Sequence, residues 1–182
     1  MRKQMNKAVL GIDVGSKGFL ALSVNDSWEY YAISEYDLLG LANIISKVKE
    51  RCEESGVKLV CVMEEIHAIF GSSAKATFSF GEIFGKLQGI VVANKIPLHF
   101  VQPKVWQKQM WANSDMVVNY KKVVVKGKET VRKEVDTKNT SYNAARRIFP
   151  EIDFRRSVRC TNFDDNKVDA TLIAEYGRRN NL

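Results

Sequence analysis

The sequence predicts an α/β protein, because strand-like runs alternate along the chain with segments of helical periodicity. The strand-like runs are short, apolar and rich in β-branched or aromatic residues, whereas apolar residues in the intervening stretches recur at three- and four-residue intervals. With 182 residues and 45% hydrophobic content, the chain can bury a core of its own, and we expect residues 1–182 to form one domain.

Five strands are expected from this pattern. The first two form a hairpin through a tight turn at Gly15, Ser16 and Lys17. The fourth is a continuous apolar run, as in a central strand covered on both faces, and it ends at Glu64 and Glu65. The expected strands cover residues 8–14, 18–24, 28–33, 57–63 and 97–101.

The helices are expected where apolar residues follow a period near 3.6, and the first of them ends before Gly56. A different pattern fills residues 111–137, where β-branched residues flank a turn and a mixed-charge arm returns, which predicts a protruding β-hairpin insertion. The expected helices begin at residue 38 and cover residues 78–94, 104–110, 138–149 and 165–179.

Charge and cysteine usage narrow the class of protein. The chain has 28 Lys and Arg against 21 Asp and Glu, with a pI near 9.3, which favours a polyanionic partner such as nucleic acid over a merely solvated surface. Cys52, Cys61 and Cys160 are odd in number and form no CxxC pair, which argues against disulfides or zinc and fits a reducing cytoplasm. Without an apolar stretch of about 18 residues, no membrane partner is expected.

Four carboxylates carry the predicted chemistry. Asp13 and Glu64 follow apolar strands, and Asp165 and Asp169 lie one turn apart at the start of the last helix, on one face. In-line phosphodiester hydrolysis uses two divalent ions roughly 3.5–4 Å apart, held by hard oxygen ligands. The set therefore predicts a magnesium-dependent nuclease, and manganese also suits such oxygen-rich sites.

Each carboxylate has a competing interpretation. Asp13 could be a turn residue of the hairpin. Glu65 competes with Glu64, because adjacent strand residues face opposite sides and only one can share a site with Asp13. Asp164 competes with Asp165, and either could cap the last helix.

Six motifs resemble, in order, those of RuvC-like Holliday junction resolvases, with bacteriophage forms the most similar. They are GIDVGS, VMEEIHA, FSFGEIFGKLQGI, VQPKVW, AARRIFP and DDNKVDATLIAEYGRR. The resemblance covers residues 8–110 and 138–180 and leaves the hairpin outside. It implies an RNase H-like fold with a five-stranded mixed sheet flanked by helices, and a homodimer that nicks four-way DNA junctions symmetrically using Mg²⁺. Such an enzyme would serve recombination, repair or packaging in the cytoplasm of a bacterial host.

The resemblance also assigns residues. It matches Asp13, Glu64, Asp165 and Asp169 to the catalytic and metal-binding acids, although Asn166 stands where the phage pattern has glycine. Lys138 matches a basic residue near the scissile phosphate, a second lysine falls at Gln107 or Lys108, and His67 falls where an aromatic stacks on a base. Other candidate phosphate contacts are Lys121, Lys122, Lys126, Lys128, Arg146, Arg147, Arg155, Arg156 and Arg159.

Gly81, Gly85 and Gly89 recur on one face of the helix expected at residues 78–94, so something should pack closely there. The resemblance places this helix at a dimer interface, and packing on the chain's own sheet is the alternative. Three other functions compete with the resolvase. They are an actin-like ATPase, which GIDVGSKGF resembles although a second phosphate loop is lacking, a broader branched-DNA nuclease, and a non-catalytic junction binder.

Overall fold

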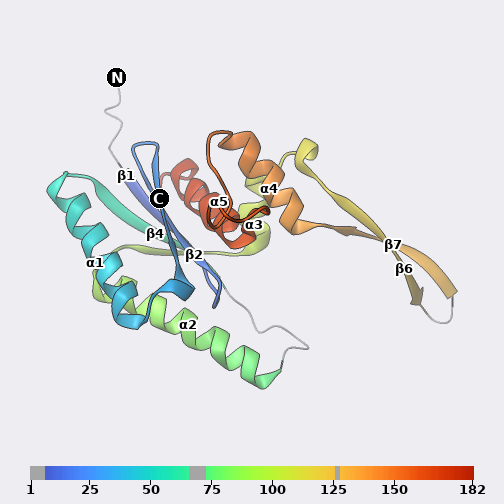
Figure 1. Cartoon of the computed structure of the whole chain (residues 1–182), viewed down its shortest axis with the longest axis horizontal. Coiled ribbons are helices and arrows are strands. Elements are labelled where there is room, and N and C mark those ends of the chain that lie inside the picture. The colour runs from blue at the N-terminus through green and yellow to red at the C-terminus, as the bar shows by residue number, and fades with distance from the viewer. Residues whose placement is uncertain (1–6, 66–72, 126–127) are drawn as a thin grey trace.

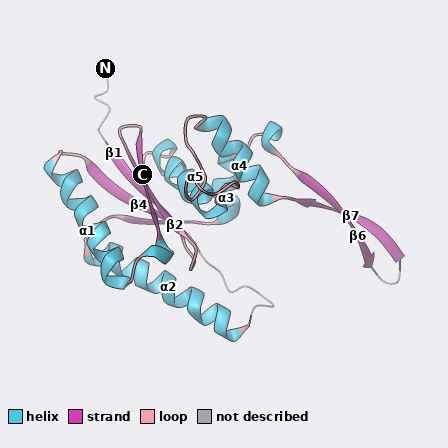
Figure 2. Cartoon of the chain, viewed as in Figure 1, coloured by secondary structure: helices cyan, strands magenta, loops and turns pink. Residues whose placement is uncertain are grey.

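A computed structural model of the chain describes residues 7–65, 73–125 and 128–182 (Figure 1). A mixed sheet lies between two layers of helices, and a two-stranded ribbon extends away from this body (Figure 2). The strands are β1 (Lys7–Asp13), β2 (Phe19–Val24), β3 (Ser27–Ala32), β4 (Lys58–Glu64), β5 (Leu98–Val101), β6 (Val118–Val125) and β7 (Lys128–Val135). The α-helices are α1 (Leu38–Glu54), α2 (Ala74–Ala93), α3 (Pro103–Met110), α4 (Thr137–Ile148) and α5 (Asp165–Arg179).

The central sheet has five strands in the order β3-β2-β1-β4-β5. The pairs β1–β2 and β2–β3 are antiparallel, as expected for consecutive hairpins, whereas β4 and β5 join in parallel after helical crossovers. The predicted α/β class and the five-stranded mixed sheet flanked by helices are confirmed. Each predicted strand lies within one or two residues of its expected bounds.

Alternate residues of the two central strands face different helical layers. In β1, Ala8, Leu10 and Ile12 belong to a core shared with α1 and α2, whereas Val9 belongs to a core shared with α3, α4 and α5. The same alternation in β4 places Met63 toward α1 and α2. Burial on both faces explains why β4 is almost wholly apolar in sequence.

Helix α5 lies unusually close to the sheet because two glycines remove side chains at the contact. A Cβ added to Gly11 of β1 would lie 2.4 Å from the carbonyl oxygen of Ala170 and 2.5 Å from the nitrogen of Ala174. A Cβ on Gly177 would lie 2.7 Å from Val62 and 2.8 Å from Val9. Glycine in the strand and in the helix therefore lets α5 approach the end of β1.

Helix α2 differs from its prediction at its start and in the direction of its glycines. It begins at Ala74 rather than at residue 78, because Ser73 caps it by accepting the N–H of Ala76 at 3.2 Å. Within the described part of the chain, a Cβ at Gly81, Gly85 or Gly89 would meet no atom within 4 Å. The alternative prediction, that these glycines pack on the chain's own sheet, is therefore wrong.

The predicted hairpin region contains the ribbon. Strands β6 and β7 pair antiparallel from Val118 opposite Val135 to Val125 opposite Lys128, and a short 3-10 helix (Asn113–Asp115) precedes them. That the ribbon is an insertion relative to the resolvases stays a prediction. None of the described helices is long and apolar enough to cross a membrane.

Candidate active site at the end of the sheet

Asp13 and Glu64 are brought together by the parallel pairing of β1 and β4. Ile12 lies opposite Met63, so the two acids end neighbouring strands at the same edge of the sheet. Ile12 and Met63 both face α1 and α2, and the alternation of side chains directs the next residue of each strand toward α5. Glu64 therefore lies on the same face of the sheet as Asp13. Glu65 is the next residue and lies on the opposite face, and its N–H donates to the carbonyl of Val101 at 2.8 Å.

Helix α5 contributes the other two carboxylates, and its cap separates Asp164 from Asp165. Asp164 Oδ1 accepts the backbone N–H groups of Asn166 at 3.1 Å and Lys167 at 3.4 Å, and its Oδ2 lies 3.5 Å from Arg156. Both oxygens of Asp164 are thus used in holding the helix end. Asp165 opens the helix and Asp169 lies one turn on, so they occupy one face.

The pKa values of Asp13 and Asp169 respond to the negative charges of neighbouring carboxylates. Burial raises the pKa of Asp13 well above its usual value, and the negative charges of Asp169, Glu64 and Asp165 raise it further. Burial also raises the pKa of Asp169 to about 7, with a hydrogen bond from Ser141 acting in the opposite direction. Carboxylates that raise each other's pKa in a partly dry site are costly unless a cation neutralises them.

One oxygen of Asp169 has the environment expected of a cation ligand. Asp169 Oδ1 is buried and has no hydrogen-bond partner among the described residues. Buried polar atoms of this kind are rare, and an ion is one recognised reason for them. The donors are all carboxylate oxygens, which is the chemistry that Mg²⁺ and Mn²⁺ accept.

The carboxylates do not form a closed ligand cage. Among the residues that the structure describes, no group of three His, Cys, Asp or Glu side chains is close enough to hold an ion as it stands. One of the carboxylates is paired with a lysine: Lys138 Nζ lies 2.5 Å from Asp165 Oδ2. The ion pair also raises the pKa of Lys138. The predicted acids are thus gathered in one place, and their chemistry fits a magnesium site.

Trp106 was missed by the sequence analysis as a site residue. Its side chain is fully buried at the start of the last turn of α3, and its indole N–H donates to Glu64 Oε1 at 2.8 Å. Burial raises the pKa of Glu64, and this hydrogen bond lowers it. A buried tryptophan usually donates its N–H to a partner. The tryptophan in VQPKVW could therefore have indicated a polar partner in the core, although not which residue it is.

Some of the predicted DNA-contacting residues are exposed in the structure, whereas Arg147 is used in a contact within the protein. Lys108, Lys121, Lys122 and Arg146 have exposed side chains, and Arg146 lies over the ring of Tyr142. Arg147 instead binds Asp115 with distances of 2.7 to 3.2 Å and donates to the carbonyl of Met110. His67 and Lys126 lie outside the described residues, as does the side chain of Lys128.

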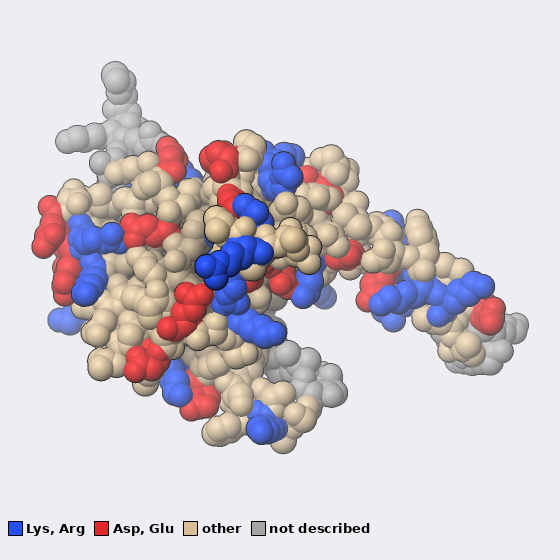
Figure 3. Space-filling view, viewed as in Figure 1, with Lys and Arg blue, Asp and Glu red and all other residues tan. Residues whose placement is uncertain are grey.

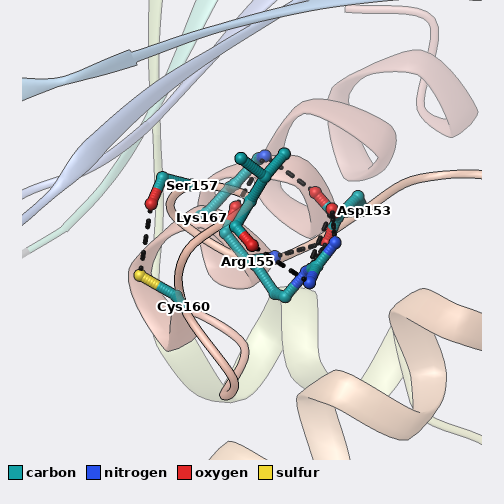
Figure 4. Close-up of polar contacts among 6 residues, drawn as sticks. Asp153, Arg155, Ser157, Cys160 and Lys167 are labelled. Carbon is teal, nitrogen blue, oxygen red and sulfur yellow. Dashed lines mark hydrogen bonds and ion pairs between the residues drawn. The ribbon is translucent and has the colours of Figure 1, made fainter.

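A basic groove adjoins Asp165. It has a volume of about 500 Å³ and includes Lys17, Arg156 and Arg159 in its lining. Next to it, the loop between α4 and α5 is stabilised by short-range contacts (Figure 4): Asp153 binds Arg155, and Lys167 donates to the carbonyls of both residues. Arg155 is therefore neutralised locally, and Arg156 and Arg159 are the arginines of this loop that line the groove.

Comparisons with known proteins give structural likenesses only. No family model matches the chain, and no curated protein matches its sequence. The chain is similar to Thermus thermophilus RuvC in complex with a Holliday junction substrate (TM-score 0.49, 14% identity, covering 95% of each chain). Another Thermus thermophilus RuvC structure gives a TM-score of 0.49, 15% identity and 96% coverage of each chain. The yeast mitochondrial Holliday junction resolvase Ydc2 gives 0.46 and 16%, covering 96% of this chain and 80% of that one.

Proposed function

We propose that this protein is a Mg²⁺-dependent endonuclease that cuts branched DNA, with four-way junctions as its principal substrate and paired symmetric nicks as its product. The observation that carries the proposal is the meeting of Asp13, Glu64, Asp165 and Asp169 at one end of the sheet, with an orphaned oxygen on Asp169. Four oxygen-donor acids beside a basic groove suit a phosphodiester substrate.

The four carboxylates would hold the metal, and the bound metal would supply an activated water and a charge opposite the leaving oxygen. Trp106 orients Glu64 and favours its ionised form through the indole hydrogen bond. Ser141 has the same effect on Asp169. Lys138 reaches the site from the start of α4, where its ammonium can stabilise charge that develops on a phosphate oxygen.

Selectivity for four-way junctions is supported by the ordered motifs that resemble those of the resolvases. The acids themselves read only a phosphodiester, so a broader branched-DNA nuclease has the same site. Basic side chains near the site, Lys17, Arg156 and Arg159, fit the phosphates of a strand that approaches Asp165. The three cysteines have no disulfide in the structure, in keeping with work in a reducing cytoplasm.

A homodimer is part of the proposal, because a four-way junction has a two-fold axis and paired nicks need two related sites. Helix α2 offers a surface for it: Gly81, Gly85 and Gly89 face open space, and the stripe continues to Phe78 and Val92, which are 74% and 58% exposed. Small residues let two helices approach closely, and flanking apolar residues would be buried by the contact.

The test is a cleavage assay with labelled four-way, three-way and linear DNA, in Mg²⁺ or EDTA. We expect paired symmetric nicks in the four-way junction that disappear in EDTA and in Asp13→Asn and Glu64→Gln variants. The matched control is Glu65→Gln. It removes the adjacent carboxylate, which lies on the opposite face of the strand, and should leave cleavage intact. Equal cutting of all branched forms would indicate the broader nuclease, and binding without metal-dependent cutting would make the protein a junction binder.

The dimer is tested separately by light scattering on a size-exclusion column. The wild type should elute as a dimer, and Gly85→Glu, which places a charge in the middle of the stripe, should elute as a monomer. A monomeric wild type, or an unchanged dimer in the Gly85→Glu variant, would remove α2 as the interface. Circular dichroism would show that the variant keeps its helices.

A further inference from the structure

The β6–β7 ribbon has two faces of different chemistry. Alternate residues and cross-strand partners share a face, so the register assigns every described side chain to one of them. We name the first the open face, made of Val118, Tyr120, Lys122, Val124, Glu129, Val131, Lys133 and Val135. We name the second the paired face, made of Asn119, Lys121, Val123, Thr130, Arg132 and Glu134.

On the paired face, Lys121 forms an ion pair with Glu134, and the charge of Arg132 also acts on that carboxylate without forming an ion pair. Lys121 Nζ lies 2.6 Å from Glu134 Oε2, and Thr130 Oγ1 donates to the carbonyl of Val123 at 3.3 Å. On the open face, Tyr120, Val124 and Val131 are 71%, 70% and 64% exposed. Within the described residues, no ion pair joins Lys122 or Lys133 to a carboxylate. The open face therefore combines apolar surface with two cations that form no ion pair within the described residues, and its one carboxylate is Glu129.

The charge of the ribbon identifies its partner as polyanionic. Residues 118–135 contain six Lys and Arg against two Glu, a net charge of +4 out of the chain's +7. Lys and Arg are visible along the projecting ribbon, away from the body (Figure 3). Such a charge density fits nucleic acid, and a two-stranded ribbon is narrow enough for the major groove of a duplex.

The root of the ribbon is fixed next to the candidate active site. Before β6, Asp115 is held by Arg147, and the N–H of Val117 donates to Thr140 of α4 at 3.0 Å. After β7, Asp136 caps α4 and donates its N–H to the carbonyl of Val117 at 2.9 Å. Lys138, three residues beyond β7, forms the ion pair with Asp165. The direction of the ribbon is thus set relative to the carboxylates.

We infer that the open face lies against one duplex arm of the branched DNA, with Lys122 and Lys133 at phosphates and Tyr120, Val124 and Val131 in the groove. The inference rests on the proposed function and specifies how its substrate is held. Each strand has eight residues, so the ribbon extends roughly 26 Å. At 3.4 Å per base pair, that length covers about seven or eight base pairs from the site. The ribbon thus requires an arm of at least that length.

The experiment measures binding in EDTA, so that it does not depend on cleavage. Four-way junctions with arms of about 6, 10 and 15 base pairs cover the proposed length. Hairpin loops close the arms and keep the short ones paired. For the wild type, we expect a gain of about tenfold in affinity between the short and middle arms and little beyond, because the ribbon adds phosphate contacts.

Two double variants with the same loss of charge distinguish the faces. Lys122→Gln with Lys133→Gln should remove the gain with arm length and reduce the slope of log affinity against log salt by about 2. Lys121→Gln with Arg132→Gln, on the paired face, should keep the length dependence. Tyr120→Thr, which retains strand propensity, should also lose affinity only for the longer arms.

Equal losses in both double variants would show that only total charge matters and would overturn the assignment of the open face. Wild-type affinity that does not change with arm length would overturn the inference altogether. Cleavage in Mg²⁺ is measured separately. A protein that binds longer arms more tightly but cuts nothing would refute the proposed nuclease and keep the ribbon contact.

Discussion

Asp13 ends β1 and Asp169 lies in α5, at the end of the sheet where the carboxylates meet, whereas Tyr120 and Val131 belong to the β6–β7 ribbon, which projects from the body (Figure 1). In the first region, three elements from distant parts of the chain bring like charges together, so each side chain is held by close packing at an electrostatic cost. In the second, two neighbouring strands pair with each other, and side chains remain exposed. The first region is expected to be rigid and sensitive to substitution, and the second tolerant.

The strongest challenge to this contrast is Gly11→Ala. Its new Cβ would lie 2.4 Å from a backbone oxygen of α5, and backbone cannot turn aside as a side chain can. We expect a loss of about 3 kcal/mol in the free energy of unfolding, measured by urea titration. The control is Gly85→Ala on α2, where a Cβ meets open space and helix propensity should add up to about 1 kcal/mol. Similar effects of the two substitutions would contradict the close approach.

The electrostatic cost at the carboxylates is tested by pH. Because the pKa of Asp169 is raised to about 7 in the folded protein, the folded state keeps a proton that the unfolded chain has lost above about pH 4. The contribution of Asp169 to the stability of the metal-free protein should therefore be fully present below about pH 4 and be lost as pH rises from about 4 through 7. Asp169→Asn should flatten this fall and add roughly 1–3 kcal/mol at pH 8, while abolishing cleavage.

The control for the pH prediction is Ser141→Ala. Ser141 lowers the pKa of Asp169, so its removal should raise that pKa further and extend the same decline to higher pH. Thermal melts across the pH series would report both variants. A wild-type stability that rises between pH 5 and pH 8 would have the wrong sign for a raised pKa.

Trp106→Phe tests the support of Glu64 at a smaller scale. The substitution keeps most of the buried ring and removes the indole N–H that lies 2.8 Å from Glu64. We expect about a tenfold loss of cleavage and an acid limb of the pH–rate profile shifted to higher pH, because Glu64 becomes harder to ionise. Trp111→Phe is the control, since the Trp111 N–H is buried without a partner among the described residues. Equal losses would mean that ring volume alone matters.

The smallest expected effect is on the ribbon. Lys121→Gln removes one exposed ion pair with Glu134, so the free energy of unfolding should change by less than about 1 kcal/mol. Urea titration at low and high salt would measure it. A loss as large as that of Gly11→Ala would show that the ribbon contributes to the fold of the body, and the contrast between the two regions would fail.

Much of the fold was predictable because its strands are short apolar runs between clear turns. The helix at Asp165–Arg179 was predicted at its observed bounds. Side chains alternate between the two faces of a strand, so the sequence alone could not decide whether Glu64 or Glu65 faces Asp13. The structure decides it, because Met63 faces α1 and α2 and Glu64 therefore faces the other layer. Trp106 could not be assigned to Glu64, because their contact spans 42 residues and depends on how α3 crosses the sheet. The structural use of Arg147 was hidden for the same reason.

The close packing of α5 on the sheet also determines at which stage of folding the site is complete. This helix follows every strand of the sheet in the chain, yet it supplies Asp165 and Asp169. A nascent or truncated chain that lacks it could still pair β1 with β4 but would present only Asp13 and Glu64. The proposed four-carboxylate site is therefore complete only after α5 has docked on Gly11.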